Sequence, residues 1–236
     1  MIDLSLVIPC YNEDQSILKL AQSCVDEFKG RNVELILVDN GSTDSSQEVF
    51  KRVNSLHPSI KVLSLNKNQG YGGGILAGLN ASSGRFLGWT HADLQTHPKD
   101  VAAAYDLLRG LEFDPNVFVK GKRYGRPLTD VVFTMAMSIF ETILMGRLLV
   151  DINAQPTIFH RNFFDEWNSP PADFSLDLFA LFEARKRNLK VLRIPVHFGA
   201  REFGVSSWNV GFVSKLRFIS RTIRYSVALK IRELRS

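Results

Sequence analysis

The sequence has few cysteines, and it lacks the usual marks of a secreted or disulfide-stabilised chain. Only two cysteines occur in 236 residues, Cys10 in an apolar run and Cys24 in a predicted helix. This pattern excludes a disulfide scaffold and a cysteine metal cluster, and it is typical of core residues in a reducing compartment. Neither a basic region nor a long apolar stretch precedes Leu4, so we expect no signal peptide and a protein that faces the cytosol.

Two common nucleotide-binding motifs are missing as well. The chain contains no Gly-Lys followed by serine or threonine, which excludes a P-loop. The segment NQGYGGG at 68–74 is similar to a dinucleotide fingerprint, but Ile75 stands where the last glycine should be. The segment also follows the third predicted strand and not the first. A dehydrogenase is therefore excluded.

The composition is that of one ordinary folded domain with an anionic partner. Hydrophobic residues make up 45% of the chain and charged residues 22%, and 236 residues favour a single core. The net charge is +5, and much of the basic excess lies in 185–187 and 215–235. Because this charge is local, we expect a nucleotide or an acidic lipid as the partner, and no nucleic acid.

Short apolar runs alternate with amphipathic segments along the first ninety residues. This alternation predicts an α/β fold with a single Rossmann-like, mostly parallel sheet flanked by helices. In such sheets ligands bind beyond the carboxyl ends of the strands. The expected strands are 4–8, 33–38, 60–65 and 85–89, and the expected helices are 15–28, 45–53 and 73–81.

The second half is less regular, and we expect it to share the same sheet. No internal repeat and no low-complexity linker separates it from the first half. Its expected elements are a helix after Pro98, strands at 117–119, 157–159 and 190–196, a long apolar stretch at 131–150 and a helix at 174–187.

Polar residues follow the first two predicted strands, in VIPCYNE at 7–13 and ILVDNGSTD at 36–44. Asp39 comes directly after a buried strand, where a carboxylate is placed to accept hydrogen bonds from a base or a ribose. Asn12 and Asp44 also fit this edge, but helix capping explains them equally well. The glycines of 70–74 favour close approach of a nucleotide to the backbone and to a helix N-terminus.

Together with GYGGGILAGLNASSGRFLGW and HADLQ, these segments resemble the nucleotide-sugar half of family 2 glycosyltransferases, in the family's order and over residues 4–100. The resemblance implies a GT-A fold and a nucleotide-diphosphate sugar as donor. It also implies the donor-binding residues, which are Pro9, Tyr11, Asn12, Glu13, Asp39, Asn40, Gly41, Asn68, Gly70, His91, Ala92 and Asp93.

HADLQ at 91–95 is the centre of the predicted site. A departing nucleotide diphosphate carries concentrated negative charge, which a divalent cation with oxygen ligands stabilises. We assign Asp93 and Gln95 to Mg²⁺ or Mn²⁺ and Asp93 to catalysis, with capping of the helix after Pro98 as the alternative for Asp93. The segment is similar to the D-A-D-L-Q of polyprenyl-phosphate sugar transferases, so His91 replaces a carboxylate. We therefore expect a looser metal site, or a contact from His91 to sugar or phosphate.

Further basic residues are candidates for phosphate or acceptor binding. Lys122, Arg123 and Arg126 lie in GKRYGRP, which resembles the family's G-S-R segment. Guanidinium groups suit bidentate phosphate binding, and a solvated basic loop is the alternative. The resemblance also assigns Arg201 to catalysis and to phosphate or acceptor binding, and it assigns Ser206 to phosphate or acceptor binding.

Two later segments depart from the family pattern. DINAQPTIFHR at 151–161 is similar to D-x-x-S-G-F-R-x-x-R, but Ala154 and Gln155 stand where serine and glycine are usual. This change leaves open the shape of the sugar pocket. The segment 171–208 resembles the family's F-x-L-E-L helix and the strand that follows, with Asp177 at the acidic, catalytic position.

The nature of the acceptor decides whether a base is needed. A sugar hydroxyl needs one, whereas a phosphate monoester, with a second pKa of about 6, is already a nucleophile. Asp177 is the candidate base, and holding an arginine or capping a turn are equal alternatives. The resemblance implies inverting transfer to a polyprenyl phosphate. A hydroxyl acceptor in surface-glycan synthesis and a catalytically silent binding module are the other hypotheses.

Two segments predict contact with a membrane. The stretch 131–150 is long enough to span a bilayer, but it carries Glu141, Gly146 and Arg147. We therefore expect a helix or helical pair at the membrane face or over the acceptor site, with core packing as the alternative. From Trp208 onward, apolar and arginine stripes predict a basic amphipathic helix that binds anionic lipid, packs on the domain or dimerises.

These observations define the expected organisation. We predict a GT-A domain at 1–207, with a nucleotide-sugar half at 1–100 and an acceptor half at 101–207, and a basic amphipathic helix at 208–236. The protein is expected to be peripheral on the cytosolic face of a membrane, and an oligomer is open.

Overall fold

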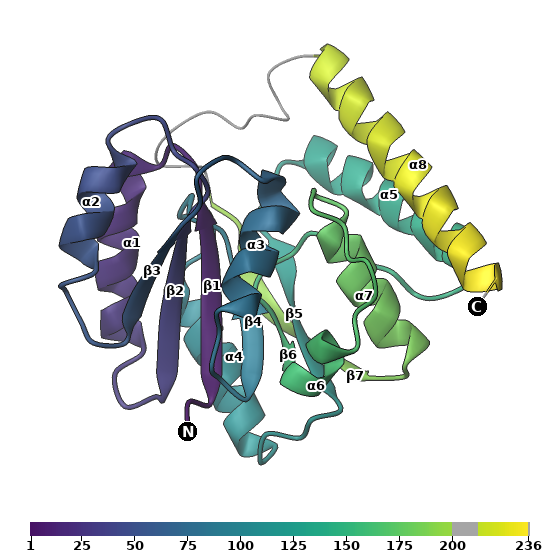
Figure 1. Ribbon diagram of the computed structural model, residues 1–236. Helices are drawn as coiled ribbons and strands as arrows, with labels where there is room; N and C mark the ends of the chain where they lie inside the picture. Colours follow the sequence, from purple (N-terminus) through teal and green to yellow (C-terminus); the bar gives the residue numbers. More distant parts are fainter. Residues whose placement is uncertain (200–211, 236) are drawn as a thin grey trace.

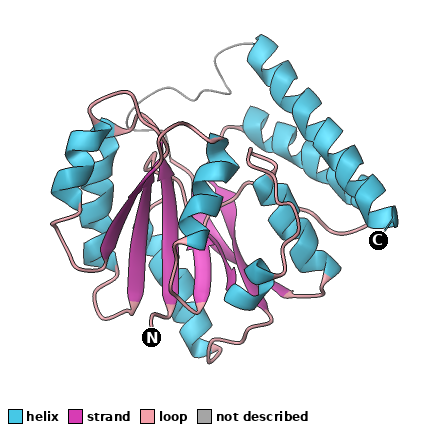
Figure 2. Ribbon diagram, viewed as in Figure 1, coloured by secondary structure: helices cyan, strands magenta, loops and turns pink. Residues whose placement is uncertain are grey.

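The computed structural model describes residues 1–199 and 212–235, which form one sheet with helices on both faces (Figures 1 and 2). The strands are β1 (Leu4–Cys10), β2 (Val33–Asp39), β3 (Ile60–Ser64), β4 (Phe86–Trp89), β5 (Val117–Tyr124), β6 (Thr157–His160) and β7 (Lys190–His197). The helices are α1 (Asp14–Glu27), α2 (Ser46–Val53), α3 (Gly70–Asn80), α4 (Pro98–Gly110), α5 (Leu128–Met145), α6 (Arg161–Asp165), α7 (Leu176–Lys186) and α8 (Phe212–Arg235). The elements expected from the sequence form with shifted ends, and the short α6 was not predicted.

The sheet runs through both halves of the chain in the order β3-β2-β1-β4-β6-β5-β7. Strands β1 to β4 pair in parallel, and β5 pairs in parallel with β7. Only β6, among the described strands, runs antiparallel to its neighbours β4 and β5. The predicted α/β fold with a single, mostly parallel sheet is therefore confirmed.

Alternating side chains of the central strands pack on opposite faces of the sheet. Leu4, Leu6 and Ile8 of β1 point to the layer that contains α1 and α4, whereas Val7 points to the layer of α3 and α7. Trp89 belongs to this second layer and is fully buried. Because helices cover both faces, these strands read as nearly continuous apolar runs in the sequence.

Helices α5 and α8 lie side by side, at the opposite end of the sheet from α1 and α2 (Figure 1). Ser226 of α8 donates a hydrogen bond of 2.6 Å to the buried carboxylate of Glu141. Arg147, just beyond the end of α5, makes an ion pair of 3.0 Å with Glu233. Within the described residues, α5 is the one helix with the length and apolar composition to cross a membrane. Most of the stretch 131–150 forms one helix, α5, and this helix pairs with α8.

At the amino-terminal ends of β1 and β2, the carboxylate of Glu34 connects neighbouring segments by hydrogen bonds. Lys61 donates to Glu34 at 2.6 Å, the Ser83 amide donates at 2.5 Å, and the Ser5 hydroxyl also donates. Burial by itself would raise the pKa of Glu34, but the hydrogen bonds from Lys61, Ser5 and Ser83 outweigh it and lower the pKa to about 2. The charged carboxylate therefore stabilises the folded state.

Replacement of Glu34 by glutamine should remove this stabilisation in a pH-dependent way. The depressed pKa contributes stability above the unfolded value near 4.5, and this contribution is lost as the pH falls towards 2. We expect Glu34→Gln to lower the free energy of unfolding by about 3 kcal/mol at pH 7, with a smaller loss at pH 3. Urea unfolding at both pH values measures the difference, and an equal loss at both would contradict the assignment.

Candidate active site

The carboxyl ends of four parallel strands lie at one edge of the sheet. Cys10 at the end of β1 is in register with Asp39 at the end of β2, and Ser64 of β3 lies opposite Asp39. On the other side of β1, β4 pairs with Leu4 to Val7. The predicted donor-binding residues lie at the ends of these strands or in the segments that follow them, and the topology brings them to this edge.

Side chains tie together the loops after β1 and β2. Asn12 has a left-handed φ of 55°, and its Oδ1 accepts a hydrogen bond of 2.9 Å from the Thr43 amide. Asp44 accepts hydrogen bonds from the amides of Asp14 at 3.4 Å and Ser46 at 3.0 Å, at the starts of α1 and α2. Asp44 therefore caps the starts of both helices, and Asn12 links the loop before α1 to the loop before α2. Pro9 and Glu13 are half-buried, and Tyr11 is exposed.

The turn after β2 holds the glycine-rich turn that starts α3. Asp39 is buried and accepts a hydrogen bond of 2.9 Å from the Ser42 amide. The Asn40 side chain donates to the Gly70 carbonyl at 2.9 Å, and it accepts from the Gln69 amide at 3.0 Å. Asn40 thus fixes this turn from the neighbouring strand. Asn68 closes the turn locally, since its Oδ1 accepts from the Gly70 amide at 2.7 Å, and Gly41 approaches the backbone of Lys67.

The glycines of α3 make close contact with the segment 171–173, which leads into α7. A Cβ at Gly70 would lie 2.6 Å from the carbonyl oxygen of Ala172, and a Cβ at Gly72 would lie 2.6 and 2.7 Å from two other carbonyl oxygens of the segment. The Gly73 amide donates to the Ala172 carbonyl at 2.9 Å. The structure therefore gives this glycine run a packing role that the sequence did not indicate.

The HADLQ segment follows β4 as a tight turn. Asp93 is 8% exposed, and its Oδ1 accepts a hydrogen bond of 3.2 Å from the Gln95 amide across Leu94, whose φ is 57°. The Gln95 side chain donates to the Gly199 carbonyl at 3.1 Å. The cap of α4 is His97, whose Nδ1 accepts from the Lys99 amide, so the alternative role for Asp93 as this cap does not apply.

The donor set at this turn suits a divalent cation that is shared with a diphosphate. Asp93 offers a carboxylate, His91 a half-buried imidazole and Gln95 an amide oxygen. Among the described residues, no group of three or more histidine, cysteine, aspartate or glutamate side chains is placed to hold a metal ion. Cations of the Mg²⁺ type are commonly held by one or two carboxylates plus substrate phosphates and water, and the residues present fit that mode. The imidazole favours Mn²⁺.

His91 belongs to a stack of three rings. The Tyr71 ring stacks with Phe174, at a centroid distance of 4.6 Å and an interplanar angle of 10°, and with His91, at 5.5 Å and 28°. Tyr71 is the second residue of α3, and Phe174 directly precedes α7. The stack therefore connects the HADLQ turn to both helices.

Asp177 lies beneath this stack in a buried polar network. Its carboxylate accepts hydrogen bonds from the Tyr71 hydroxyl at 3.0 Å, from the side-chain amide of Gln155 at 2.8 Å and from the Lys120 ammonium group at 3.2 Å. Lys120 is fully buried and also donates to Thr157 at 2.8 Å. Burial lowers the pKa of Lys120 to about 8 although the charge of Asp177 opposes this shift. Asp177 thus pairs with a lysine. The roles considered from the sequence were a catalytic base, a partner of an arginine and the cap of a turn.

A second cluster surrounds Asp151, between β5 and β7. Arg123 donates to the Asp151 carboxylate from Nε at 2.8 Å and from its amide at 2.7 Å, and Arg126 lies 3.8 Å away. Arg193 of β7 donates to the Gly121 carbonyl at 2.9 Å, and burial lowers its pKa to about 10. Burial would raise the pKa of Asp151, but the charge of Arg123 and its hydrogen bonds lower it. Arg123 and Arg126 thus share one carboxylate, and Arg193 donates to backbone carbonyls of the same segment.

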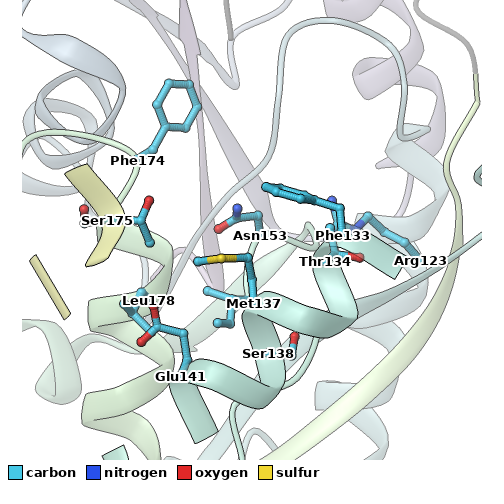
Figure 3. Close-up of a pocket in the computed structure, with 12 residues that line it drawn as sticks. Arg123, Phe133, Thr134, Met137, Ser138, Glu141, Asn153, Phe174, Ser175 and Leu178 are labelled. Atoms are coloured by element: carbon cyan, nitrogen blue, oxygen red, sulfur yellow. The ribbon is translucent and has the colours of Figure 1, made fainter. Parts of the chain in front are cut away.

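Arg123 also lines a pocket between α5, α8 and the start of α7 (Figure 3). Figure 3 shows Phe133 beside Arg123 on one side and Phe174 on the other, with Met137 between them. The pocket thus joins a basic end to apolar walls. Its lining consists of Arg123, Phe133, Thr134, Met137, Ser138, Glu141, Ile152, Asn153, Phe174, Ser175, Leu178 and Thr222.

The remaining predicted residues divide between described and undescribed parts of the chain. Ala92 is buried beside Asp93. Lys122 is exposed, whereas Arg123 and Arg126 are half-buried, so only Lys122 of these three fits the alternative of a solvated basic loop. Arg201, Ser206 and the boundary at 207/208 lie outside the described residues. Their predicted roles stay predictions.

Sequence reasoning missed Tyr71, Lys120, Arg193 and Phe174. Lys120 and Arg193 each directly follow apolar residues within a strand, where a basic residue is a signal that it has a buried partner. Tyr71 and Phe174 gave no such signal, because aromatic residues at these positions are equally consistent with the core.

The sheet topology, with polar segments gathered at one edge, defines a GT-A glycosyltransferase fold. Residues 5–180 match the family model described as glycosyl transferase family 2, and the chain belongs to this family. The expected family and fold are thereby confirmed.

Named relatives include undecaprenyl-phosphate 4-deoxy-4-formamido-L-arabinose transferases. The protein of Salmonella paratyphi A is 29% identical over 216 residues, which cover 87% of this chain and 62% of the relative. The protein of Enterobacter sp. is 26% identical over 217 residues, with the same coverage of 87% and 62%. The chain therefore spans 62% of the length of these relatives.

Solved structures share the fold at low sequence identity. Glucosyl-3-phosphoglycerate synthase of Mycobacterium tuberculosis, in complex with Mn²⁺, UDP-glucose and phosphoglyceric acid, has a TM-score of 0.73 at 17% identity, covering 97% of this chain and 79% of that one. A mannosyltransferase of Pyrobaculum calidifontis, in complex with GDP-Man and Mn²⁺, has a TM-score of 0.67 at 17% identity, covering 94% and 64%.

The close contact between α3 and segment 171–173 predicts a position-dependent effect of alanine. Gly72→Ala should destabilise the protein by about 1–3 kcal/mol, because the backbone must shift to admit the Cβ. Gly110→Ala is the matched control, since a Cβ there meets nothing within 4 Å, and it should be neutral or slightly stabilising. Urea unfolding compares the two variants, and equal stabilities would disprove the proposed contact.

Proposed function

We propose that the protein transfers a sugar, with inversion, from a nucleotide-diphosphate sugar to a polyprenyl phosphate at the cytosolic face of a membrane. The observation that carries the acceptor class is the pocket with a basic end at Arg123 and apolar walls from α5 and α7. Membership of glycosyl transferase family 2 and the names of the relatives support this class.

The donor is proposed to lie at the carboxyl edge of β1, β2 and β4. The buried Asp39 sits where a carboxylate can accept hydrogen bonds from a base or ribose, and its turn is fixed by Ser42. Asp93 and His91 of the HADLQ turn are proposed to lie beside the diphosphate. A bound Mg²⁺ or Mn²⁺ would supply positive charge to the departing diphosphate, with Asp93 as its protein carboxylate and Gln95 as a further ligand.

The acceptor phosphate is proposed to bind the arginines around Asp151. Arg123 and Arg126 carry two positive charges against one carboxylate, and Arg193 adds a third. This excess attracts a phosphate dianion, and guanidinium groups bind its oxygens in pairs. Lys122, which is exposed, and Arg201 are proposed to complete the phosphate site.

A phosphate acceptor agrees with the state of Asp177. A phosphate oxygen attacks the anomeric carbon while the bond to the diphosphate breaks, and no proton has to be removed. The Asp177 carboxylate is 1% exposed and accepts hydrogen bonds from Tyr71, Gln155 and Lys120. It is therefore poorly placed to accept a proton from a hydroxyl, which favours the phosphate over the hydroxyl acceptor.

The outer faces of α5 and α8 are proposed to bind the membrane. The exposed apolar side chains follow helical spacing, and Ile139 and Ile143 are 55% and 77% exposed. Exposed arginines of α8 flank them and suit anionic headgroups. The apolar set consists of Leu128, Val132, Met135, Ile139 and Ile143 of α5 and of Ile223, Val227, Ile231 and Leu234 of α8.

The donor assignment is tested with purified protein. Thermal-shift measurements with UDP, GDP, CMP and dTDP sugars, with and without Mn²⁺, should select one donor class, because a ligand of the folded state raises its stability. Hydrolysis of the selected donor should require the metal, and Asp93→Asn should reduce it by about 10²–10³-fold.

Asp114→Asn is the matched control for this variant. The Asp114 carboxylate also accepts an amide hydrogen bond from the residue two positions later, Asn116, at 2.9 Å, but it lies in the turn before β5. This control should hydrolyse the donor normally. A silent binding module would bind the donor and hydrolyse none in any variant, which would refute the proposed activity.

Membrane contact is tested by vesicle flotation. Burial of an isoleucine in an apolar phase is worth about 1.5–3 kcal/mol, so Ile139→Ser with Ile143→Ser should weaken binding to phosphatidylglycerol-containing vesicles at least tenfold. Leu56→Ser is the control, because Leu56 is 41% exposed but follows α2 at the far end of the sheet. Unchanged flotation of the double variant would exclude this face as the contact.

A further inference from the structure

The histidine of the HADLQ turn is held by an aromatic ring from another element. His91 follows β4, and it stacks on Tyr71 at a centroid distance of 5.5 Å with 28° between the planes. Offset aromatic pairs at this distance contribute about 0.5–1.5 kcal/mol beyond the area that they bury. The contact therefore restricts the orientation of the imidazole at the site proposed for the diphosphate.

Tyr71 is itself held by a second aromatic ring. Phe174 lies nearly parallel to it, at 4.6 Å and 10°. Phe174 cannot easily move away, because the residues directly before it form the segment 171–173 that packs against Gly70 and Gly72. Movement of the Tyr71 ring is thus restricted by a packed neighbour.

The third constraint on Tyr71 acts at its hydroxyl. This group donates a hydrogen bond of 3.0 Å to Asp177 and accepts one of 3.2 Å from the Gln155 amide. Asp177 is in turn fixed by Lys120, at 3.2 Å, and both charged side chains are buried. A hydrogen bond between a neutral donor and a buried carboxylate is stronger than a neutral pair. Both the plane of the ring and its position along the ring axis are therefore determined.

We propose that Tyr71 is a positioning residue for His91, holding the imidazole in the orientation in which it contacts the donor diphosphate. The inference rests on the proposed function for the identity of the ligand, but the positioning is a property of the free protein. It also assigns a role to Asp177, which acts on the donor site through the Tyr71 hydroxyl.

His91 stands where the family pattern has a carboxylate, and this difference explains why a stacking tyrosine is needed. A carboxylate at position 91 would be oriented by the cation that it binds, whereas an imidazole binds such cations less strongly and has a flat face. Stacking orients a flat ring without using its nitrogen atoms, which stay available for a ligand. Tyr71 thus supplies the orientation that a carboxylate would gain from the metal.

The first test reads the stack in the free protein by nuclear magnetic resonance. In protein labelled at its five histidines, the His91 ring signals are identified by their loss in His91→Asn. We expect the Tyr71 ring to shift them upfield, and Tyr71→Leu to abolish that shift. Unchanged His91 signals in Tyr71→Leu would overturn the positioning, whatever the activity of the protein.

The second test measures the donor KM and kcat with the donor selected by the thermal-shift screen. Loss of the stack should raise the donor KM about two- to tenfold in Tyr71→Leu, with the acceptor KM unchanged. Tyr71→Phe keeps the ring and loses the anchor, so it should raise the donor KM by less. His91→Asn should raise the donor KM at least as much as Tyr71→Leu, and no effect in either variant would overturn the proposal.

Tyr105→Phe is the matched control for loss of a tyrosine hydroxyl. Tyr105 donates to Asp3 at 2.9 Å, at the opposite end of the sheet from His91. A general loss of stability would lower the melting temperature in both phenylalanine variants, but only Tyr71→Phe should change the donor KM. An equal donor KM in the two variants would show that the Tyr71 hydroxyl has no positioning role.

A double-mutant cycle tests the link from Asp177. If Asp177 acts through Tyr71, then Asp177→Asn combined with Tyr71→Phe should raise the donor KM no more than the stronger single variant does. Additive effects would show that Asp177 acts on the site independently of Tyr71. If the screen finds no donor, the proposed function fails, while the resonance measurement still decides whether Tyr71 orients His91.

Discussion

The carboxylate of Asp177 joins the two halves of the molecule, since it accepts hydrogen bonds from Tyr71 of α3 and from Lys120 of β5. The ion pair with Lys120 lies within the second half and fixes the carboxylate there, because breaking such a buried pair costs about 3–5 kcal/mol. The hydrogen bond from Tyr71 then ties the fixed carboxylate to the first half. Gln155 completes the network from the segment before β6. The edge proposed for the donor and the pocket proposed for the acceptor are therefore parts of one rigid unit, although they come from different halves of the chain.

This connection explains two departures from the family pattern. Gln155, which stands where the pattern has glycine, fills the buried space beside Asp177 and donates to it, so the replacement adds a polar partner to the network. His91, which stands where the pattern has a carboxylate, stacks on the tyrosine that Asp177 anchors. Both changes thus converge on Asp177. These two departures from the pattern are therefore connected.

The pocket at Arg123 lies between this rigid unit and the α5–α8 pair. The inner faces of these helices are tied by Glu141 and Ser226, and their outer faces expose aliphatic side chains. An amphiphile with a phosphate head could therefore keep its apolar part against α5 while its phosphate reaches the arginines around Asp151. This arrangement relates the proposed membrane face to the proposed chemistry by a short path along the protein.

The sequence by itself determined the fold class, the positions of most helices and strands, and the edge at which the site lies. These follow from local patterns, because apolar periodicity sets the elements and parallel strands gather their carboxyl ends. Only the tertiary structure decided the direction of β6, the partners of Asp177 and the close contact of Gly72 with segment 171–173. Lys120 and Asp177 are 57 residues apart. A pair so distant in the chain is brought together by the order of the strands, and no local pattern of residues records that order.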